Sequence, residues 1–339
     1  MSKLTDTHIS LAHGNGGRFM RELIEQLIAE SLGDRLLDIE NDAAHIELDS
    51  GDADLMITTD GFTVKPLEFP GGDIGSLAVH GTINDLAVSG AIPSYLTLNL
   101  FIEEGLDVAL LQRLLASLAR AARESNVRIA CGDTKVVPRG EGSGVYLATT
   151  GVGQRPRDVQ LGFSRIESGD AILVSGPIGD HGIAVMLARE QFGLRGDVRS
   201  DAASVLPLTR RAVGLSGLRY MRDPTRGGLA TVLHEIQRAT GLGVRVNEAR
   251  IPVRDPVTMV CEMLGYDPYY LACEGRVVAI IAAEQAESLL DTWRQLPDGE
   301  HAAIIGHLNR EDACVVLETE LGGERVLEEL EDEPLPRIC

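Results

Sequence analysis

The sequence predicts a two-domain protein of mixed α/β or α+β structure, and three observations support this prediction. The chain has 339 residues, and domains of about 150 residues are common. Patterns typical of helices and strands alternate along its first half. A polar, arginine-rich segment at 154–168 then separates that half from a second series of strands, glycine turns and helices. We therefore place the domains at 1–155 and 156–315, followed by a tail at 316–339.

Hydrophobic periodicity predicts the individual elements. Apolar residues recur every three or four positions in the predicted helices, whereas short β-branched runs mark the predicted strands. The predicted helices are 18–32, 74–89, 108–123, 183–189 and 228–240. The predicted strands are 54–59, 127–131, 145–153, 171–175 and 277–283. Strand, glycine turn and helix follow one another in both halves, and no solenoid repeat is present.

The last part of the chain differs in composition from the domains. It is strongly acidic from about Leu317, and it ends with Pro-Leu-Pro-Arg-Ile-Cys. Pro334 and Pro336 bias the residues before them toward extended backbone. These features predict a flexible acidic tail that carries the thiol of Cys339 at its end. A chance thiol on a frayed terminus is the simpler alternative.

Charge and lysine content exclude several classes of protein. Acidic residues outnumber basic ones by 51 to 31, which gives a formal net charge of −20. Nucleic acid and anionic membrane surfaces would be repelled by this charge. We find no apolar segment long enough for a membrane span and no signal peptide, and we expect a cytoplasmic protein. The lysines are Lys3, Lys65 and Lys135. None follows a glycine, so the chain has no Walker-A loop.

Two glycine-rich segments are candidates for phosphate binding. Gly14, Asn15, Gly16 and Gly17 come just before the first predicted helix, where backbone N–H groups can bind an anion. A flexible turn explains this segment equally well. Residues 223–228 (DPTRGG) open a second helix. There Asp223 or Thr225 could cap the helix, or the two glycines and the arginine could contact a phosphate.

Four aspartates are candidate magnesium ligands. They are Asp42, Asp60, Asp85 and Asp133. Mg²⁺ prefers carboxylate oxygens together with water and phosphate oxygens. Asp60 and Asp133 lie beside glycines, where an aspartate is commonly a turn residue. Asp85 lies within a predicted helix among apolar residues, and a carboxylate on a packed face needs a partner.

Lys135 and Glu274 are the candidate catalytic side chains of the two domains. Lys135 is a lysine in a chain that otherwise uses arginine, which suggests a compact point charge, although an ordinary surface lysine explains it too. Glu274 precedes an apolar strand-like run, where burial favours a proton-accepting carboxylate. A turn residue before Gly275 is the alternative for this glutamate.

Eight short motifs occur in a fixed order along the chain. They are HGNGG, DAA, TTDGFTVKPLEFPGGDIG, GTINDLAVSGA, CGDTKV, TGVG, DPTRGG and the terminal PRIC. Together they resemble the HypE family of hydrogenase maturation carbamoyl dehydratases over essentially the whole chain. The resemblance implies a two-domain PurM-like fold related to aminoimidazole ribonucleotide synthetase. It also implies a homodimer formed through strands of the N-terminal domain, and ATP binding without a P-loop.

The resemblance implies a specific reaction as well. A HypF-type carbamoyltransferase places a carbamoyl group on Cys339, and ATP then drives its dehydration to a thiocyanate. The cyano group passes to iron held by a HypC–HypD complex, for the active site of [NiFe]-hydrogenase. In this scheme the four aspartates hold Mg²⁺, the residues from Gly14 to Gly17 and Thr134 contact ATP, and Asp223 and Thr225 belong to the same site. Lys135 stabilises developing charge, and Glu274 takes the nitrogen proton.

Two other functions remain open from the sequence. One is a selenophosphate synthetase-like enzyme or small-molecule phosphotransferase of the same superfamily, which would not need Cys339. The other is a non-catalytic scaffold whose acidic tail docks maturation partners. We expect His80 to be a packed neutral histidine and Cys273 to be a packing residue.

Overall fold

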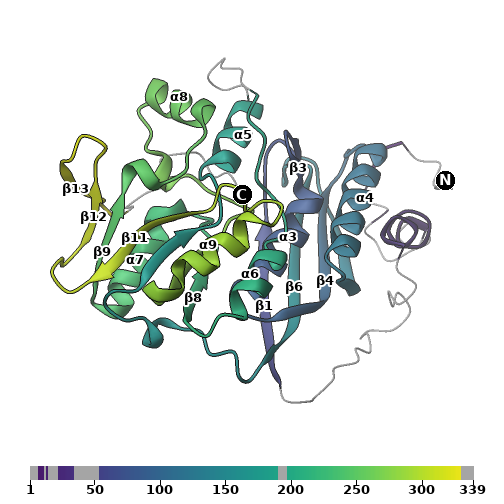
Figure 1. Cartoon of the computed structure of the whole chain (residues 1–339). Coiled ribbons are helices and arrows are strands. Elements are labelled where there is room, and N and C mark those ends of the chain that lie inside the picture. Colours follow the sequence, from purple (N-terminus) through teal and green to yellow (C-terminus); the bar gives the residue numbers. More distant parts are fainter. Residues whose placement is uncertain (1–6, 11–12, 14–21, 34–52, 190–196, 330–339) are drawn as a thin grey trace. The chain divides into compact units, whose positions relative to one another are not determined.

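The computed structural model of the chain describes residues 7–10, 13, 22–33, 53–189 and 197–329 (Figure 1). The described residues form two compact units. The first contains those up to Leu86 together with Ala91–Pro156, and the second contains Ala87–Gly90 and those from Arg157 onward. The division after Pro156 lies beside the boundary placed at 155/156 in the sequence. None of the described helices has both the length and the apolar character needed to cross a bilayer.

The N-terminal unit is built on a four-stranded sheet with the order β1-β6-β4-β5. The strands are β1 (Ala53–Phe62), β6 (Val145–Pro156), β4 (Ile92–Glu103) and β5 (Arg128–Val137). The first two pairings are antiparallel, whereas β4 and β5 run parallel and are joined by helix α4 (Val108–Glu124). A parallel pair needs such a crossover. β2 (Glu68–Phe69) and β3 (Gly72–Asp73) form a separate short ribbon.

Helices cover one face of this sheet. α3 (Ile74–Val88) and α4 lie along it in Figure 1, and the short helical segments η2 (Ile24–Ala29) and α2 (Glu30–Leu32) pack against α4. Asp107 caps α4, since its side chain accepts a 2.9 Å hydrogen bond from the backbone N–H of Leu110. Leucines at helical spacing then face the sheet and are buried.

The opposite face of the sheet exposes apolar side chains in the described part of the chain. Leu55 and Ile57 on β1 are 60% and 70% exposed, and Ile92 and Phe101 on β4 are also exposed. The strand register places all four on the same side, because Leu55 and Ile92 both pair with Gln154 of β6. We call the surface formed by Leu55, Ile57, Ile92 and Phe101 the open face.

The C-terminal unit contains a seven-stranded sheet with the order β13-β12-β9-β11-β7-β10-β8. Its strands are β7 (Ala171–Val174), β8 (Leu218–Arg222), β9 (Gly243–Asn247), β10 (Val278–Ile281), β11 (Ala303–Asn309), β12 (Val315–Glu318) and β13 (Glu324–Val326). Its α-helices are α5 (Asp180–Ala188), α6 (Leu206–Val213), α7 (Gly228–Thr240), α8 (Asp255–Leu264) and α9 (Ala286–Arg294). Short 3-10 turns lie at Phe163–Arg165, Glu248–Arg250, Pro268–Tyr270 and Ala283–Gln285.

The inner strands of this sheet are buried on both faces, as alternate residues of β7 illustrate. Ile172 and Val174 pack into a core with α7, whereas Ala171 and Leu173 pack on the other side with α6 and α9. A strand covered on both faces reads as a continuous apolar run. This explains why 171–175 and 277–283 could be recognised in the sequence.

The predicted flexible tail begins too early. Residues 315–318 form β12, which pairs in parallel with β9, and 324–326 form β13 beside it. Acidic side chains of this region are held by Arg245, which donates to Glu318 at 3.1 Å and to Glu324 at 2.7 Å. Leu327 is buried in the core. The apolar run at 315–317 (VVL) could have identified β12, but both strands are short and the acidic residues around them concealed them.

Most of the other predicted elements are present in the described residues, although several bounds differ and several elements of the C-terminal unit were not predicted. The helices expected at 74–89, 108–123 and 228–240 are confirmed as α3, α4 and α7. Strand β5 continues beyond the predicted 127–131 to Val137. Strand β4, which lies between β6 and β5, was not predicted. Its alternating sequence YLTLNLF (95–101) is the period-two signal that could have identified it.

Candidate active site

Asp60 and Asp85 lie on facing surfaces of β1 and α3 in the N-terminal unit. The Oγ1 of Thr58 donates a 2.9 Å hydrogen bond to Oδ2 of Asp85. One helical turn earlier, a Cβ built on Gly81 would lie 4.0 Å from Oδ2 of Asp60 and 2.7 Å from the ring of Phe62. Gly81 therefore allows the helix to approach the strand closely. The sequence predicts that Asp85 needs a partner on its packed helix face, and the Thr58 hydroxyl is such a partner.

Asp133 and Lys135 lie on β5, at the other edge of the same sheet. Because β6 and β4 lie between β1 and β5, Asp133 is three strand spacings, roughly 14 Å, from Asp60. The register also places Asp133 and Gly61 on the same side as the open face, whereas Asp60 faces the helices. In one chain, Asp133 therefore does not join Asp60 and Asp85 at one metal ion. This corrects the expectation of a single converging set.

Local contacts on β5 tie Asp133 to its neighbours. Its Oδ2 lies 3.1 Å from Nζ of Lys135, and its Oδ1 accepts a 2.8 Å bond from the N–H of Thr134. The Lys135 side chain is 59% exposed, and Thr134 is buried. The lysine is therefore a solvent-facing cation at the edge of the sheet.

The donors at β1 and α3 suit magnesium. Two carboxylates beside a hydroxyl are hard oxygen donors, and Mg²⁺ is commonly held by one or two carboxylates, with water and phosphate oxygens completing its shell. Within the described ranges, no three His, Cys, Asp or Glu side chains form a group that could hold a metal ion, so water or phosphate oxygens would have to complete the shell. The residues fit a metal that arrives with a phosphate ligand.

Three glycine-containing segments lie where the ends of β7 and β8 meet the start of β10 in the C-terminal sheet. β10 is antiparallel to both β7 and β8, so Val278 at its start pairs with Val174 and Arg222 at their ends. The turn at 176–182, the segment DPTRGG (223–228) and the segment before β10 are therefore neighbours. The backbone N–H of Cys273 donates to the carbonyl of Pro224 at 3.0 Å. This register brings Glu274 close to Asp223.

The DPTRGG segment forms a tight turn into α7. Gly227 and Gly228 have φ values of 71° and 59°, which favour glycine. A Cβ on Gly228 would also lie 2.5 Å from the carbonyl oxygen of Leu271. Gly227 is the N-cap, and no side chain caps the helix. Asp223, which is buried, and Thr225, which is half-buried, therefore do not have the capping role considered for them.

Glu274 is buried and its backbone is held on both sides. Its N–H donates a 3.2 Å hydrogen bond to Oδ1 of Asp201, and its carbonyl accepts a 3.4 Å bond from the N–H of Ala203. The adjacent Cys273 is also buried, and its Sγ accepts a 3.2 Å bond from the N–H of Gly179. Burial raises the pKa of the Cys273 thiol well above its ordinary value, as expected for a packing residue.

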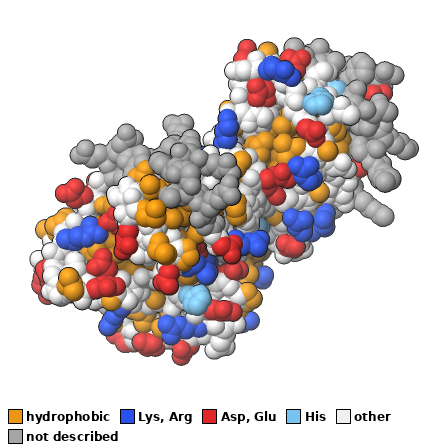
Figure 2. Space-filling view, turned by 90° about the horizontal axis from the view of Figure 1, so that it is seen from above, with side chains coloured by type: hydrophobic (Ala, Val, Ile, Leu, Met, Phe, Trp, Pro, Cys, Tyr) orange, Lys and Arg blue, Asp and Glu red, His pale blue; other side chains and the backbone are white. Residues whose placement is uncertain are grey.

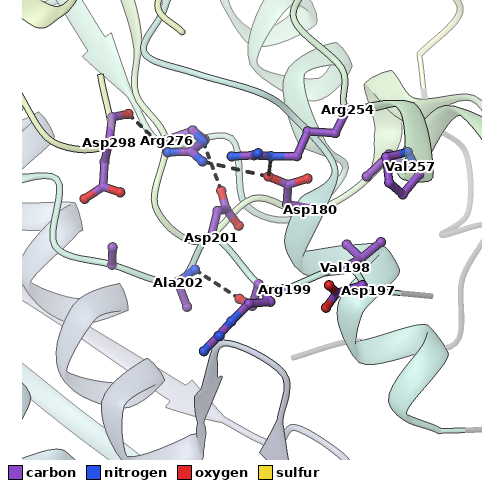
Figure 3. Close-up of a pocket in the computed structure, with 13 residues that line it drawn as sticks. Asp180, Asp197, Val198, Arg199, Asp201, Ala202, Arg254, Val257, Arg276 and Asp298 are labelled. Atoms are coloured by element: carbon purple, nitrogen blue, oxygen red, sulfur yellow. Dashed lines mark hydrogen bonds and ion pairs between the residues drawn. The ribbon is translucent and has the colours of Figure 1, made fainter. Parts of the chain in front are cut away.

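A cavity of about 420 Å³ lies next to this segment. Arg276, which is 5% exposed, lies between two buried aspartates that line it (Figure 3). Its Nε is 3.5 Å from Asp201 Oδ2, and its Nη2 is 3.9 Å from Asp180 Oδ2. Arg254 donates to the same Asp180 oxygen at 2.9 Å. Burial, followed by the charge of Asp201, raises the pKa of Asp180.

Sequence reasoning missed this charged network. Arg276 stands directly before the apolar run 277–283, and a charge beside such a run was the available signal, whereas Asp180 lies in a glycine turn three residues before Ile183. His181 belongs to the same region and is fully buried, with Nδ1 2.8 Å from the Oγ of Ser200. Burial lowers the pKa of His181 to about 4, so the ring is neutral at pH 7. Burial also lowers the pKa of His80 to about 4, which agrees with the expected neutral histidine.

Several predicted site residues lie outside the described residues. They are Gly14, Asn15, Gly16, Gly17, Asp42 and Cys339. His13, beside the glycine segment, is buried, and its Nδ1 accepts a 3.1 Å hydrogen bond from the N–H of Ser10.

Comparisons with known proteins identify the family of the chain. Residues 40–154 match the N-terminal domain of AIR synthase related protein, and 167–319 match its C-terminal domain. The carbamoyl dehydratase HypE of Azotobacter vinelandii is 46% identical over 338 residues, which cover 99% of this chain and 98% of that protein.

Solved structures agree with this match. A crystal structure of hydrogenase maturation protein HypE in complex with ATP is 44% identical, has a TM-score of 0.91, and is matched over 97% of this chain and 99% of that one. A chain in a crystal structure of a HypE–HypF complex is 37% identical and has a TM-score of 0.79. The match covers 93% of this chain and 100% of that one. The resemblance seen in the motifs is thereby confirmed, as is the two-domain fold. This chain belongs to the HypE family of carbamoyl dehydratases, within the AIR synthase-related proteins.

Proposed function

We propose that this chain uses ATP to dehydrate an S-carbamoyl group on Cys339 to a thiocyanate, the source of the cyanide ligand of [NiFe]-hydrogenase iron. The observation that carries the proposal is the match to carbamoyl dehydratases over nearly the full length of both chains, together with the motif PRIC that contains Cys339. The ATP complex of a relative that is 44% identical supports ATP as the co-substrate.

The reaction has a simple balance. The γ-phosphoryl group of ATP is transferred to the carboxamide oxygen, which is otherwise a poor leaving group. The nitrogen then loses both of its protons, the carbon–oxygen bond breaks, and phosphate departs with that oxygen. The products are the thiocyanate, ADP and phosphate. Attachment of the substrate to the protein makes the reaction intramolecular, which raises its effective concentration.

Two side chains are the catalytic groups that we propose. In the C-terminal unit, the buried Glu274 accepts a proton from the nitrogen. In the N-terminal unit, the Lys135 ammonium stabilises negative charge that develops on the carboxamide oxygen or phosphate. Gly14–Gly17, Thr134, Asp223 and Thr225 are proposed contacts for ATP.

Magnesium is the metal that we propose for the reaction. Asp60 and Asp85 would hold it, together with Asp42. When bound, it neutralises charge on the triphosphate. Asp133 is proposed to act with Lys135 from the side of the open face.

The expected test result is a two-step change in mass at the C-terminus. Incubation with a HypF-type carbamoyltransferase, carbamoyl phosphate and ATP should add one carbamoyl group to Cys339 and then remove one water. Mass spectrometry of the intact C-terminal peptide follows both steps. Cys339→Ser is the control and should show neither change. If wild-type Cys339 gains the carbamoyl group but never loses water, the dehydratase proposal fails.

We also propose three interactions with other chains. The HypE–HypF complex of a relative supports a carbamoyltransferase as the partner that loads Cys339. A HypC–HypD complex is the proposed acceptor of the cyano group. Lys and Arg side chains are interspersed with Asp and Glu on the face shown in Figure 2, in keeping with protein partners rather than nucleic acid.

The third proposed interaction is a homodimer formed through the open face. An exposed apolar surface on a sheet is typical of a protein interface. Ile57→Lys should therefore convert a dimer to a monomer, since it places a charge within the proposed interface. Size-exclusion chromatography with light scattering measures the mass. Met259→Lys on α8, at an apolar residue of the other unit that is 58% exposed, should leave the dimer intact. A dimeric Ile57→Lys protein would exclude this interface.

A further inference from the structure

The segment 200–203 packs directly against the backbone that carries Glu274. Oδ1 of Asp201 accepts the N–H of Glu274 at 3.2 Å, and the N–H of Ala203 donates to the carbonyl of the same residue at 3.4 Å. A Cβ on Gly275 would lie 1.9 Å from the carbonyl oxygen of Asp201. Only glycine permits this approach, so the two segments are fixed at close range.

Asp201 is itself held on its other side. Its Oδ2 lies 3.5 Å from Nε of Arg276, and the Asp201 side chain is fully buried. Arg276 also donates from Nε to the carbonyl of Pro177 at 2.9 Å, and from Nη1 to the carbonyls of Gly275 and Asp298 at 3.3 Å. The guanidinium thus connects the 176–182 turn, the segment at 201 and the residue after Glu274. Figure 3 shows it beside Asp180, Asp201 and Asp298.

A buried histidine completes the support. Nδ1 of His181 lies 2.8 Å from Oγ of Ser200, and the same oxygen accepts the N–H of Ala202 at 3.0 Å. Hydrogen bonds therefore hold the residues on both sides of Asp201, since Ser200 contacts the buried His181 and Ala202 contacts Ser200. They restrict the backbone that presents the Asp201 carboxylate to the Glu274 N–H.

We propose that Asp201 is a positioning residue for Glu274: its carboxylate bonds the backbone N–H of Glu274 and, with Arg276, sets the direction from which that glutamate reaches the substrate. The proposal rests on the function proposed above. Asp201 touches the backbone of Glu274 and no reacting atom. Its effect is to restrict the backbone of the proposed base, and a misplacement of about 1 Å can lower a rate by about 10²-fold.

The test measures a single turnover of carbamoylated Cys339 at a series of ATP concentrations. Asp201→Ala should lower the maximal rate constant by about 10- to 100-fold and leave the ATP concentration at half-maximal rate within about twofold. Asp201→Asn keeps an oxygen that can accept the Glu274 N–H, and it should restore most of the rate. Asp298→Asn, which removes a charge from the same cavity without touching Asp201, should behave like wild type.

Hydrogen exchange provides a second readout that does not depend on catalysis. The Glu274 amide should be protected in wild type and in Asp201→Asn, and should exchange faster in Asp201→Ala. Asp201→Ser, whose hydroxyl is too short to reach the same donor, replaces the alanine variant if that protein does not fold.

The results separate the positioning role of Asp201 from the proposed dehydratase function. An unchanged rate or unchanged Glu274 protection in Asp201→Ala would overturn the positioning role. An Asp201→Asn protein as slow as Asp201→Ala would also overturn it, since the hydrogen bond would then not be the cause. If the wild-type protein does not dehydrate the carbamoyl group on Cys339, the proposed function fails. Protection of the Glu274 amide then still decides whether Asp201 holds the Glu274 backbone.

Discussion

Glu274→Gln should lower the rate of dehydration of carbamoylated Cys339 by about 10²- to 10⁴-fold, which is the usual contribution of a general base. Glutamine has nearly the same shape, so the buried position and the backbone hydrogen bond to Asp201 should be kept. It cannot accept a proton as a carboxylate does. Quenched-flow samples analysed by mass spectrometry measure the rate, and the ATP concentration at half-maximal rate should change little.

A matched control separates this effect from loss of negative charge. Glu287 lies exposed on α9 of the same unit, and Glu287→Gln should retain the wild-type rate. Lys135→Ala should also block dehydration, and its fold should be unaffected because an exposed ion pair contributes at most about 1 kcal/mol. A Glu274→Gln protein within threefold of wild type would show that the base is another group.

Arg276→Met should destabilise the C-terminal unit by about 3–5 kcal/mol, because it leaves two buried carboxylates without their shared cation. Asp180 and Asp201 both face Arg276, and both of their side chains are almost fully buried. Burial already raises the pKa of Asp180, because its surroundings disfavour the charged form. Loss of the guanidinium also removes donors to three backbone carbonyls.

The single tryptophan of the chain makes this measurement specific. Trp293 is fully buried in the core of the C-terminal unit, so its fluorescence in urea reports the unfolding of that unit. Arg254→Met is the matched control, since Arg254 pairs with the same Asp180 oxygen but its side chain is 51% exposed. It should cost about 1 kcal/mol. Equal losses in the two variants would contradict a role for burial of Arg276.

Local patterns predicted much of the fold and some of the site. Helical periodicity located α4 and α7, and continuous apolar runs located β7 and β10, because a residue's burial follows from its position within its own element. The scarcity of lysine drew attention to Lys135 and the following strand drew attention to Glu274, but only the family resemblance gave them a catalytic role, which stays a prediction. The tail was placed too early because β12 and β13 are short and lie among acidic residues, so the apolar run at 315–317 was overlooked.

By itself, the sequence determined the class of protein: two mixed domains, a candidate ATP site without a Walker-A loop, and a terminal thiol at Cys339. Only the tertiary structure decided which side chains meet. It separated Asp133 from Asp60 and Asp85 by placing them on opposite faces of one sheet. It also brought Asp201 to Glu274, although 73 positions separate them in the chain. Such contacts depend on strand order and register, which arise from packing of the whole unit and leave no trace in the local spacing of residues.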